Sequence, residues 1–208
     1  MSNPLQSLRG FLAPAAHAHE LPLFPLNAVL FPGGRLRLKV FEARYLDMAA
    51  DCLRGNLPFG VCLIKQGTEV GLAALPEAVG CHARIVTADM DGPGVMRIEA
   101  RGERRFVVEN TRLEANQLLL GQVRDKDDEA PLPVPDHCRT ALMFLKALAA
   151  KAPDAGLENI RNDASWAGFR LAEVLPLKAG ARQAMLEMND GVKRLEILLE
   201  FMRRSGLG

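Results

Sequence analysis

Histidines, a run of acids and a few serines are the side chains in this sequence that could do catalytic or metal chemistry. His82 and His137 fall in different segments, and a shared catalytic site would need a polar cleft that brings them together. The acids from Asp127 to Glu129 could bind a divalent cation, although such a run is usually solvated. Ser165 and Ser205 have no histidine near them in sequence, and Ser165 fits the start of a helix better.

The common catalytic motifs are absent as well. The sequence contains no Gly-x-x-x-x-Gly-Lys-Ser/Thr phosphate loop, no Gly-x-Ser-x-Gly elbow and no His-Glu-x-x-His zinc motif. It also has no glycine fingerprint that opens a helix. We therefore predict a protein that is not an enzyme, with no catalytic residues, no metal site and no cofactor.

The four cysteines favour a structural role. Cys52, Cys62, Cys81 and Cys138 have no Cys-x-x-Cys spacing and lie within apolar runs. This pattern is typical of buried free thiols in a reducing compartment, so we expect a cytoplasmic protein. A disulfide or a metal site is the alternative.

Composition and charge limit the partners. The 208 residues include 26 Lys and Arg against 25 Asp and Glu, so no basic surface indicates nucleic acid. No run approaches the roughly 18 apolar residues of a membrane span. Residues 1–19 lack a long enough apolar run for a secretion signal, and we expect a flexible tail in which His17 and His19 are incidental.

The first two-thirds of the chain has the pattern of strands. Apolar segments are short and end in glycine, proline or charge, and residues 35–40 alternate cleanly. Residues 101–104 resemble a hairpin turn between two of the strands. The other strands are predicted at 59–64, 81–88, 94–100, 105–109 and 117–124.

One helix interrupts these strands. Between residues 41 and 54, Tyr45, Met48 and Cys52 fall on one helical stripe, and Gly55 follows as a stop signal. Such a helix can plug one end of a closed or nearly closed antiparallel barrel and protect the sheet edges.

The last third has the pattern of a helical bundle. Residues 125–135 are charged and then proline-rich, which is typical of a linker. After it, four apolar stripes at helical spacing predict four short helices that pack on one another and on the barrel. Trp166, the only tryptophan, starts the second of these helices and is expected to anchor the bundle core.

The sequence LFPLNAVLFPGG, residues 23–34, contains Leu-Phe-Pro twice. Two prolines exclude one helix through both copies. The first copy is predicted to end a strand, with Phe24 in the core. The second leads into a glycine turn, and we expect Phe31 to lie on a surface that contacts another chain.

Several motifs, taken in order, carry a family resemblance. They occur at residues 21–26, 30–33, 41–45, 59–61, 67–71, 79–81 and 102–106, and residues 166–177 extend the match into the helices. The chain resembles the substrate-binding, N-terminal domain of Lon proteases in its stand-alone form, since no ATPase or protease motif follows.

The resemblance implies both a fold and a role. The expected fold is α+β: a PUA-like antiparallel barrel at residues 20–124 with one inserted helix, a linker at 125–135 and a helical bundle at 136–208. The expected role is non-catalytic binding of unfolded or damaged polypeptide, or of a partner protein, as an adaptor or regulator of proteolysis. The oligomeric state stays open.

Candidate residues for polypeptide binding are accessible apolar side chains, because the target would be defined by exposed apolar sequence. They are Phe24, Leu30, Phe31, Tyr45 and Phe59. The alternative is that these side chains form the barrel core. A second functional hypothesis, RNA binding by a PUA-like barrel, would depend on the cations of one strand face, Arg35, Arg37 and Lys39.

Overall fold

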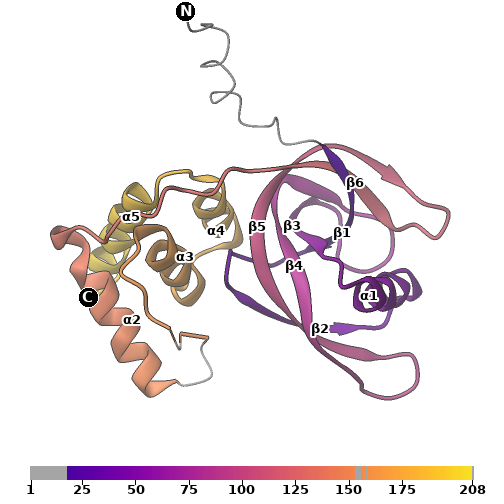
Figure 1. Ribbon diagram of the computed structural model, residues 1–208, viewed down its shortest axis with the longest axis horizontal. Coiled ribbons are helices and arrows are strands. Elements are labelled where there is room, and N and C mark those ends of the chain that lie inside the picture. The colour runs from indigo at the N-terminus through magenta and orange to yellow at the C-terminus, as the bar shows by residue number, and fades with distance from the viewer. Residues whose placement is uncertain (1–17, 153–155, 158, 208) are drawn as a thin grey trace, which may run out of the picture.

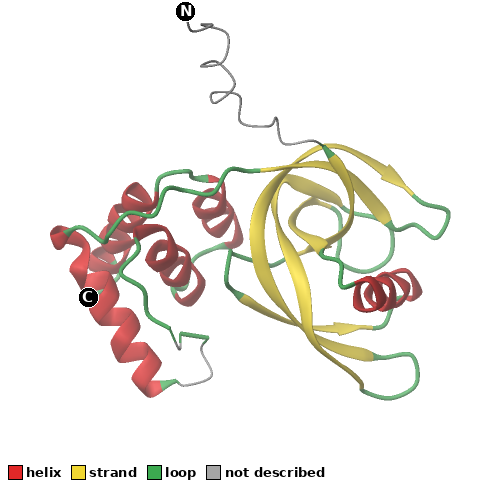
Figure 2. Cartoon of the chain, in the orientation of Figure 1, coloured by secondary structure: helices red, strands yellow, loops and turns green. Residues whose placement is uncertain are grey.

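The protein consists of a sheet with one helix packed against it, followed by a group of helices, as Figures 1 and 2 show. The structure, a computed structural model, describes residues 18–207 except 153–155 and 158. The sheet elements are β1 (His19–Leu26), β2 (Arg35–Val40), α1 (Ala43–Gly55), β3 (Phe59–Gln66), β4 (Leu75–Met90), β5 (Met96–Leu113) and β6 (Leu119–Asp125). The helical elements are η1 (Asp136–Cys138), α2 (Arg139–Lys151), α3 (Ala164–Val174), α4 (Ala179–Glu187) and α5 (Gly191–Arg204).

The six strands pair in the order β2-β5-β4-β3-β1-β6, and β5 also pairs with β6. The pairings from β5 through β4, β3, β1 and β6 therefore return to β5 and form a ring, and β2 lies outside it, paired with β5. Most pairs are antiparallel, but β1 runs parallel to β3. The prediction of a purely antiparallel sheet is wrong at this pair, because the chain crosses over through β2 and α1 before it returns beside β1.

Strand β5 corrects the predicted hairpin at residues 101–104. It is continuous over 18 residues, and Gly102 lies within it. The backbone of Gly102 exchanges hydrogen bonds with the turn at Gly33 and Gly34, at 2.7 and 2.9 Å. A Cβ at residue 102 would lie 2.1 Å from the carbonyl oxygen of Phe31. This glycine marks a close approach of two backbones, not a turn.

Helix α1 agrees with the predicted inserted helix. Tyr45, Met48 and Cys52 on its buried stripe pack into the core formed by β1 and the neighbouring strands. The helix ends at Asn56, which adopts the left-handed conformation with φ 48°. Its apolar stripe therefore covers part of the sheet, as the sequence predicts.

The four predicted C-terminal helices are present, and the group packs on the sheet and on the loop between β1 and β2 through α3 and α4. Their shared core includes Phe31 of that loop and Val79 of β4. Buried polar side chains also cross between the two parts: Arg170 of α3 donates to the carbonyl of Pro32 at 2.9 Å, and Gln183 of α4 donates to that of Val79 at 3.0 Å. Trp166 is partly buried against this core, in agreement with its predicted role.

Two segments at the predicted boundaries differ from expectation. His19, assigned to the tail, is the first residue of β1, where it pairs with Val123 of β6. Asp125, assigned to the linker, ends β6. Within the remaining linker the Glu129 side chain is 5% exposed and Val134 is 6% exposed, so this segment does bury side chains. The rest of the predicted tail, residues 1–17, lies outside the described residues.

Candidate functional site

An apolar hollow opens on the surface between α1 and the strands β1 and β6. Its volume is about 340 Å³, and apolar side chains form most of its wall. These are Leu21 and Pro22 from β1, Met48 and Cys52 from α1, Leu57 and Pro58 after α1, and Leu118 and Leu120 at the start of β6. The sequence spacing of these residues places their side chains on the same side of each element. Met48 and Cys52 are four apart on a helix, and Leu118 and Leu120 are two apart along an extended chain.

Leu57 is the accessible part of this wall, because 58% of its surface is exposed. The end of α1 presents it: Asn56 turns the chain in the left-handed conformation, and the Leu57 amide then donates to the carbonyl of Cys52 at 3.0 Å. A helix-terminating turn of this kind fixes the backbone at Leu57 against the last turn of α1.

Charged groups surround the apolar wall. Glu20, Asp51 and Glu114 line the hollow beside the apolar residues. Arg112 donates to Glu20 at 2.8 Å, and this hydrogen bond lowers the pKa of the Glu20 carboxyl below its usual value. Asp51 pairs with Arg54. The hollow thus has an apolar floor and an acidic rim, and concave, mostly apolar surfaces with a few polar groups are where ligands commonly bind.

The five apolar residues proposed from the sequence are all buried. Their exposed fractions are Phe24 7%, Leu30 3%, Phe31 0%, Tyr45 4% and Phe59 0%. Phe24 stacks on Tyr45 with ring centroids 3.9 Å apart, inside the core beneath α1. In the described structure they form core, as the alternative interpretation has it, and polypeptide binding through them stays a prediction that this burial does not support.

The surface position expected for Phe31 is wrong. Its ring packs against Phe169 of α3 at a centroid distance of 5.8 Å. The turn that follows it is held against β5 and α3, so Phe31 points between the sheet and the helices of its own chain. The sequence predicts that this phenylalanine contacts another chain, whereas it contacts α3 of its own chain.

A second apolar surface lies at the loop between β3 and β4. Leu72 in that loop is 83% exposed. Leu75 and Leu113, which are 51% and 50% exposed, line a nearby hollow of about 390 Å³. Sequence reasoning passed over both exposed surfaces, because single leucines after a turn or within a loop have no periodicity that marks them.

His82 and His137 do not share a site. His82 lies 2.8 Å from Asp125, whereas His137 lies 3.2 Å from Glu196 of α5. The structure instead brings His19 next to His82, with ring centroids 5.7 Å apart. Sequence reasoning missed this group because both His19 and Asp125 were placed outside the strands.

In the acidic run at residues 127–129, which could have bound a divalent cation, Asp128 and Glu129 face arginines. Glu129 is paired with Arg105 at 3.0 Å and with Arg194, and Asp128 lies 3.4 Å from Arg104. These carboxylates therefore neutralise arginines of the protein itself.

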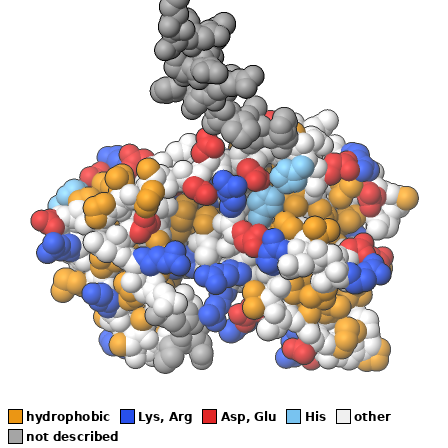
Figure 3. Space-filling view, in the orientation of Figure 1, with side chains coloured by type: hydrophobic (Ala, Val, Ile, Leu, Met, Phe, Trp, Pro, Cys, Tyr) orange, Lys and Arg blue, Asp and Glu red, His pale blue; other side chains and the backbone are white. Residues whose placement is uncertain are grey.

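The cations on β2 do not form an unpaired basic face. Arg35 and Arg37 lie 3.8 and 3.0 Å from Glu99, and Lys39 lies 3.6 Å from Asp91. On the face shown in Figure 3, basic and acidic side chains both occur over the sheet and over the helices. The three cations that favoured RNA binding are therefore paired with two carboxylates, and Asp91 also pairs with Arg97.

The four cysteines are buried free thiols, as predicted. Burial raises the pKa of Cys62 to about 12 and that of Cys52 to about 11. Ser165 follows the start of α3, where Asp163 caps the helix by accepting from the Trp166 amide at 2.6 Å. Of the helices in the described segments, none combines the length and apolar character that crossing a membrane requires.

The fold is a mixed α+β domain with a six-stranded sheet, and it carries an apolar hollow between α1 and the strands β1 and β6. A family model described as the ATP-dependent protease La (LON) substrate-binding domain matches residues 20–204. The chain therefore belongs to the Lon substrate-binding domain family.

Known proteins agree with this assignment. The chain is 29% identical over 197 residues to Lon protease 2 of Myxococcus xanthus, covering 88% of this chain but 23% of that protein. The crystal structure of a Lon N-terminal domain protein from Xanthomonas campestris is 37% identical with a TM-score of 0.73, covering 88% of this chain and 98% of that one. The N-terminal domain of the Mycobacterium avium complex Lon protease shares the fold, with a TM-score of 0.61 at 17% identity and coverage of 89% and 98%.

Proposed function

We propose that this protein is a non-catalytic recognition module that binds apolar segments of unfolded or damaged polypeptide in the hollow beside Leu57. The observation that carries the proposal is an accessible apolar wall with an acidic rim in a member of a substrate-binding family. A polypeptide could place one or two apolar side chains on this wall while its polar backbone stays near the charged rim.

Binding to one copy should be weak. Burial of roughly 300 Å² of apolar surface contributes about 8 kcal/mol. The loss of translational freedom and the ordering of a flexible chain offset much of this gain. Weak, reversible contacts suit a module that samples many polypeptides, and several copies acting together would raise the effective affinity.

The role in proteolysis is part of the same proposal. The chain spans about a quarter of the length of the curated relative, Lon protease 2. We expect it to hold polypeptides for a protease, as an adaptor or regulator, without cutting them. The closed ring of strand pairings also supports the proposal that its sheet is a PUA-like barrel.

Polypeptide binding can be measured by the fluorescence anisotropy of labelled β-casein, which is largely unfolded. Leu57→Asp places a charge on the wall of the hollow, and we expect it to weaken binding about tenfold, the loss of about 1.4 kcal/mol. Met143→Asp is the matched control, because Met143 is 69% exposed on α2, away from the hollow. It should bind as the wild type does.

Other outcomes would contradict parts of the proposal. No binding by the wild type would contradict polypeptide recognition itself. Unchanged binding by Leu57→Asp would contradict the assigned hollow, and a loss with Leu72→Asp instead would move the site to the loop between β3 and β4.

A further inference from the structure

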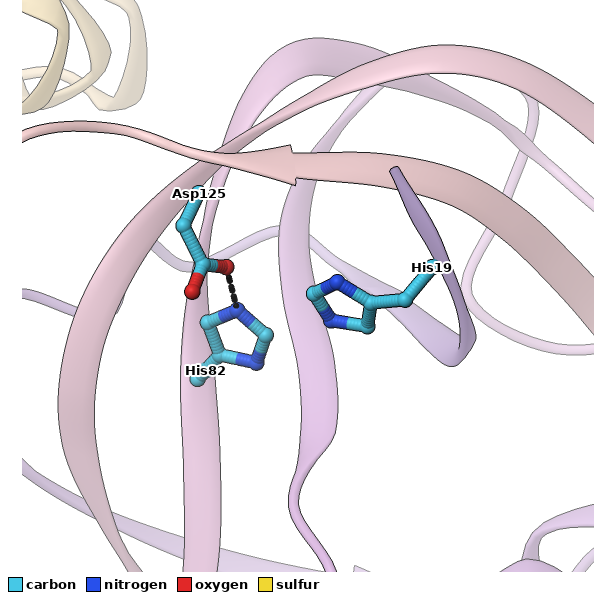
Figure 4. Close-up of side chains that lie close together, drawn as sticks. All are labelled: His19, His82 and Asp125. Carbon is cyan, nitrogen blue, oxygen red and sulfur yellow. Dashed lines mark hydrogen bonds and ion pairs between the residues drawn. The ribbon is translucent and has the colours of Figure 1, made fainter. Parts of the chain in front are cut away.

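Three potential metal ligands converge where strands β1, β4 and β6 meet. His19 begins β1, His82 lies in β4 and Asp125 ends β6 (Figure 4). One ligand atom from each of them lies within 4.8 Å of the others. The group is therefore formed by residues 43 or more positions apart in sequence, and the sheet alone brings them together.

The side chains already face one another. Nε2 of His82 lies 2.8 Å from Oδ1 of Asp125. The His19 ring is nearly parallel to that of His82, at an interplanar angle of 13°, and its nitrogens lie on the side turned toward His82 in Figure 4. Two imidazole rings and a carboxylate thus border one small volume.

His82 has a ring nitrogen without a hydrogen-bond partner. Its side chain is buried, with 6% of the residue exposed, and Nδ1 makes no hydrogen bond within the described residues. A histidine ring can offer either of its nitrogens to a metal ion.

Each carboxylate oxygen of Asp125 has a charged or polar neighbour. Its Oδ2 lies 3.8 Å from Arg104, which also pairs with Asp128 and is 54% exposed. Oδ1 instead faces His82. The Arg104 charge reduces the negative potential at the site, but it lies on the side of the carboxylate away from the histidines.

We propose that His19, His82 and Asp125 bind a divalent transition-metal ion, for which Zn²⁺ is the best match. Two imidazoles and one carboxylate are a known ligand set for Zn²⁺, with the remaining position open to water. The occupied site would fasten the first residue of β1 to β4 and β6.

Binding requires a small rearrangement of the ligands. With bonds of about 2.0–2.1 Å, ligand atoms in a tetrahedral site are about 3.3 Å apart. Nε2 of His82 and Oδ1 of Asp125, now 2.8 Å apart, must separate slightly, and the wider separations, all within 4.8 Å, must close by at most about 1.5 Å. His19 can supply this movement by rotation of its side chain, because it is exposed at the start of a strand.

The experiment is a calorimetric titration of the full chain with ZnCl2, after chelator treatment and without a polyhistidine tag. We expect one ion per chain. Because loss of an outer-shell partner already weakens metal binding about ten- to a hundredfold, His19→Ala should weaken it about a hundredfold or more. Asp125→Asn, which keeps the size of the side chain, should weaken it at least tenfold.

His137→Ala is the matched control, because it also removes one histidine but leaves this group intact. It should bind Zn²⁺ as the wild type does. Circular dichroism should show that all three variants fold, since neither His19 nor Asp125 is buried. Co²⁺ added to the wild type should give the visible absorption of a tetrahedral site, and His19→Ala should abolish it.

Two results would overturn the proposal. One is a wild type that binds no Zn²⁺ at one ion per chain. The other is a folded His19→Ala variant that binds as tightly as the wild type, which would leave His82 and Asp125 as a structural hydrogen bond only. Both results concern Zn²⁺ binding by the chain and leave the Leu57→Asp test of the polypeptide hollow, which His19 also lines, to be decided by β-casein binding alone.

Discussion

The carboxylate of Glu129 lies buried against the guanidinium of Arg105, at 3.0 Å, between the sheet and the helices. Arg194 of α5 donates to the same carboxylate at 3.1 Å and has no exposed surface. Arg105 also donates to the carbonyls of Leu186 and Met188, at 2.8 and 2.7 Å. One carboxylate from the segment after β6 thus balances two arginines that hold the helices on the sheet.

Glu129→Gln should destabilise the fold by about 3–5 kcal/mol, because it leaves two arginine charges buried without a counter-ion. Urea denaturation followed by circular dichroism measures the change. Asp128→Asn is the control: that carboxylate is 74% exposed beside Arg104, and an exposed pair contributes about 1 kcal/mol or less. If the two variants lower the free energy of unfolding equally, the buried pairing of Glu129 with Arg105 and Arg194 contributes no more than an exposed ion pair.

Glu173 of α3 predicts a stability that depends on pH. Burial raises the pKa of its carboxyl from 4.5 to about 7, although Arg170 and Arg182 oppose the shift. Between these values the folded chain holds more protons than the unfolded chain, so stability falls as pH rises through this window. The ionised carboxylate should cost up to about 3 kcal/mol above pH 7.

Glu173→Gln imitates the protonated form and isolates this effect. The free energy of unfolding of the wild type, minus that of the variant, should decrease between pH 5 and pH 8. Taking the difference removes contributions from other titrating groups that both proteins share. If the wild type is the more stable protein at pH 8, the ion pair with Arg170, at 2.9 Å, outweighs burial.

The four thiols should be unreactive in the folded protein. All are buried, and burial raises the pKa of the Cys62 thiol to about 12, so little thiolate forms at neutral pH. With Ellman's reagent we expect slow labelling under native conditions and rapid labelling of four thiols in denaturant. Rapid labelling of one thiol without denaturant would show that a segment covering it opens readily.

Local periodicity predicts the elements of this fold well. The stripe of Tyr45, Met48 and Cys52 and the alternation of residues 35–40 depend only on neighbouring residues, and both appear as α1 and β2. The same is true of the four C-terminal helices. Motif order adds the family, which the match over residues 20–204 confirms.

Long-range contacts explain what the sequence could not show. Phe31 is apolar beside a glycine turn, and nothing local indicates that Phe169 covers it. His19 and Asp125 stand at strand ends, where periodicity fades. Their approach to each other follows from the pairing of β1 with β6, and the approach of Asp125 to His82 follows from the pairing of β5 with both β4 and β6. The sequence also does not indicate that leucines such as Leu57 are exposed, because exposure depends on how the chain folds around them.

At Gly102 the local sequence pattern and the long-range contacts point to different structures. A glycine flanked by charged residues resembles a turn, but here it lies in β5, where a Cβ would meet the Phe31 carbonyl at 2.1 Å. Gly102→Ala should therefore separate the turn at residues 31–34 from the strand and destabilise the fold by about 1–3 kcal/mol or more.

Gly180→Ala is the control for this substitution. Nothing lies within 4 Å of a Cβ at Gly180, which is in α4, so alanine should stabilise that helix by about 0.5–1 kcal/mol. Thermal unfolding of both variants measures the contrast. The two substitutions are chemically identical, so opposite signs can arise only from the surroundings of each glycine. A Gly102→Ala variant as stable as the wild type would mean that β5 and the turn at residues 31–34 do not approach this closely.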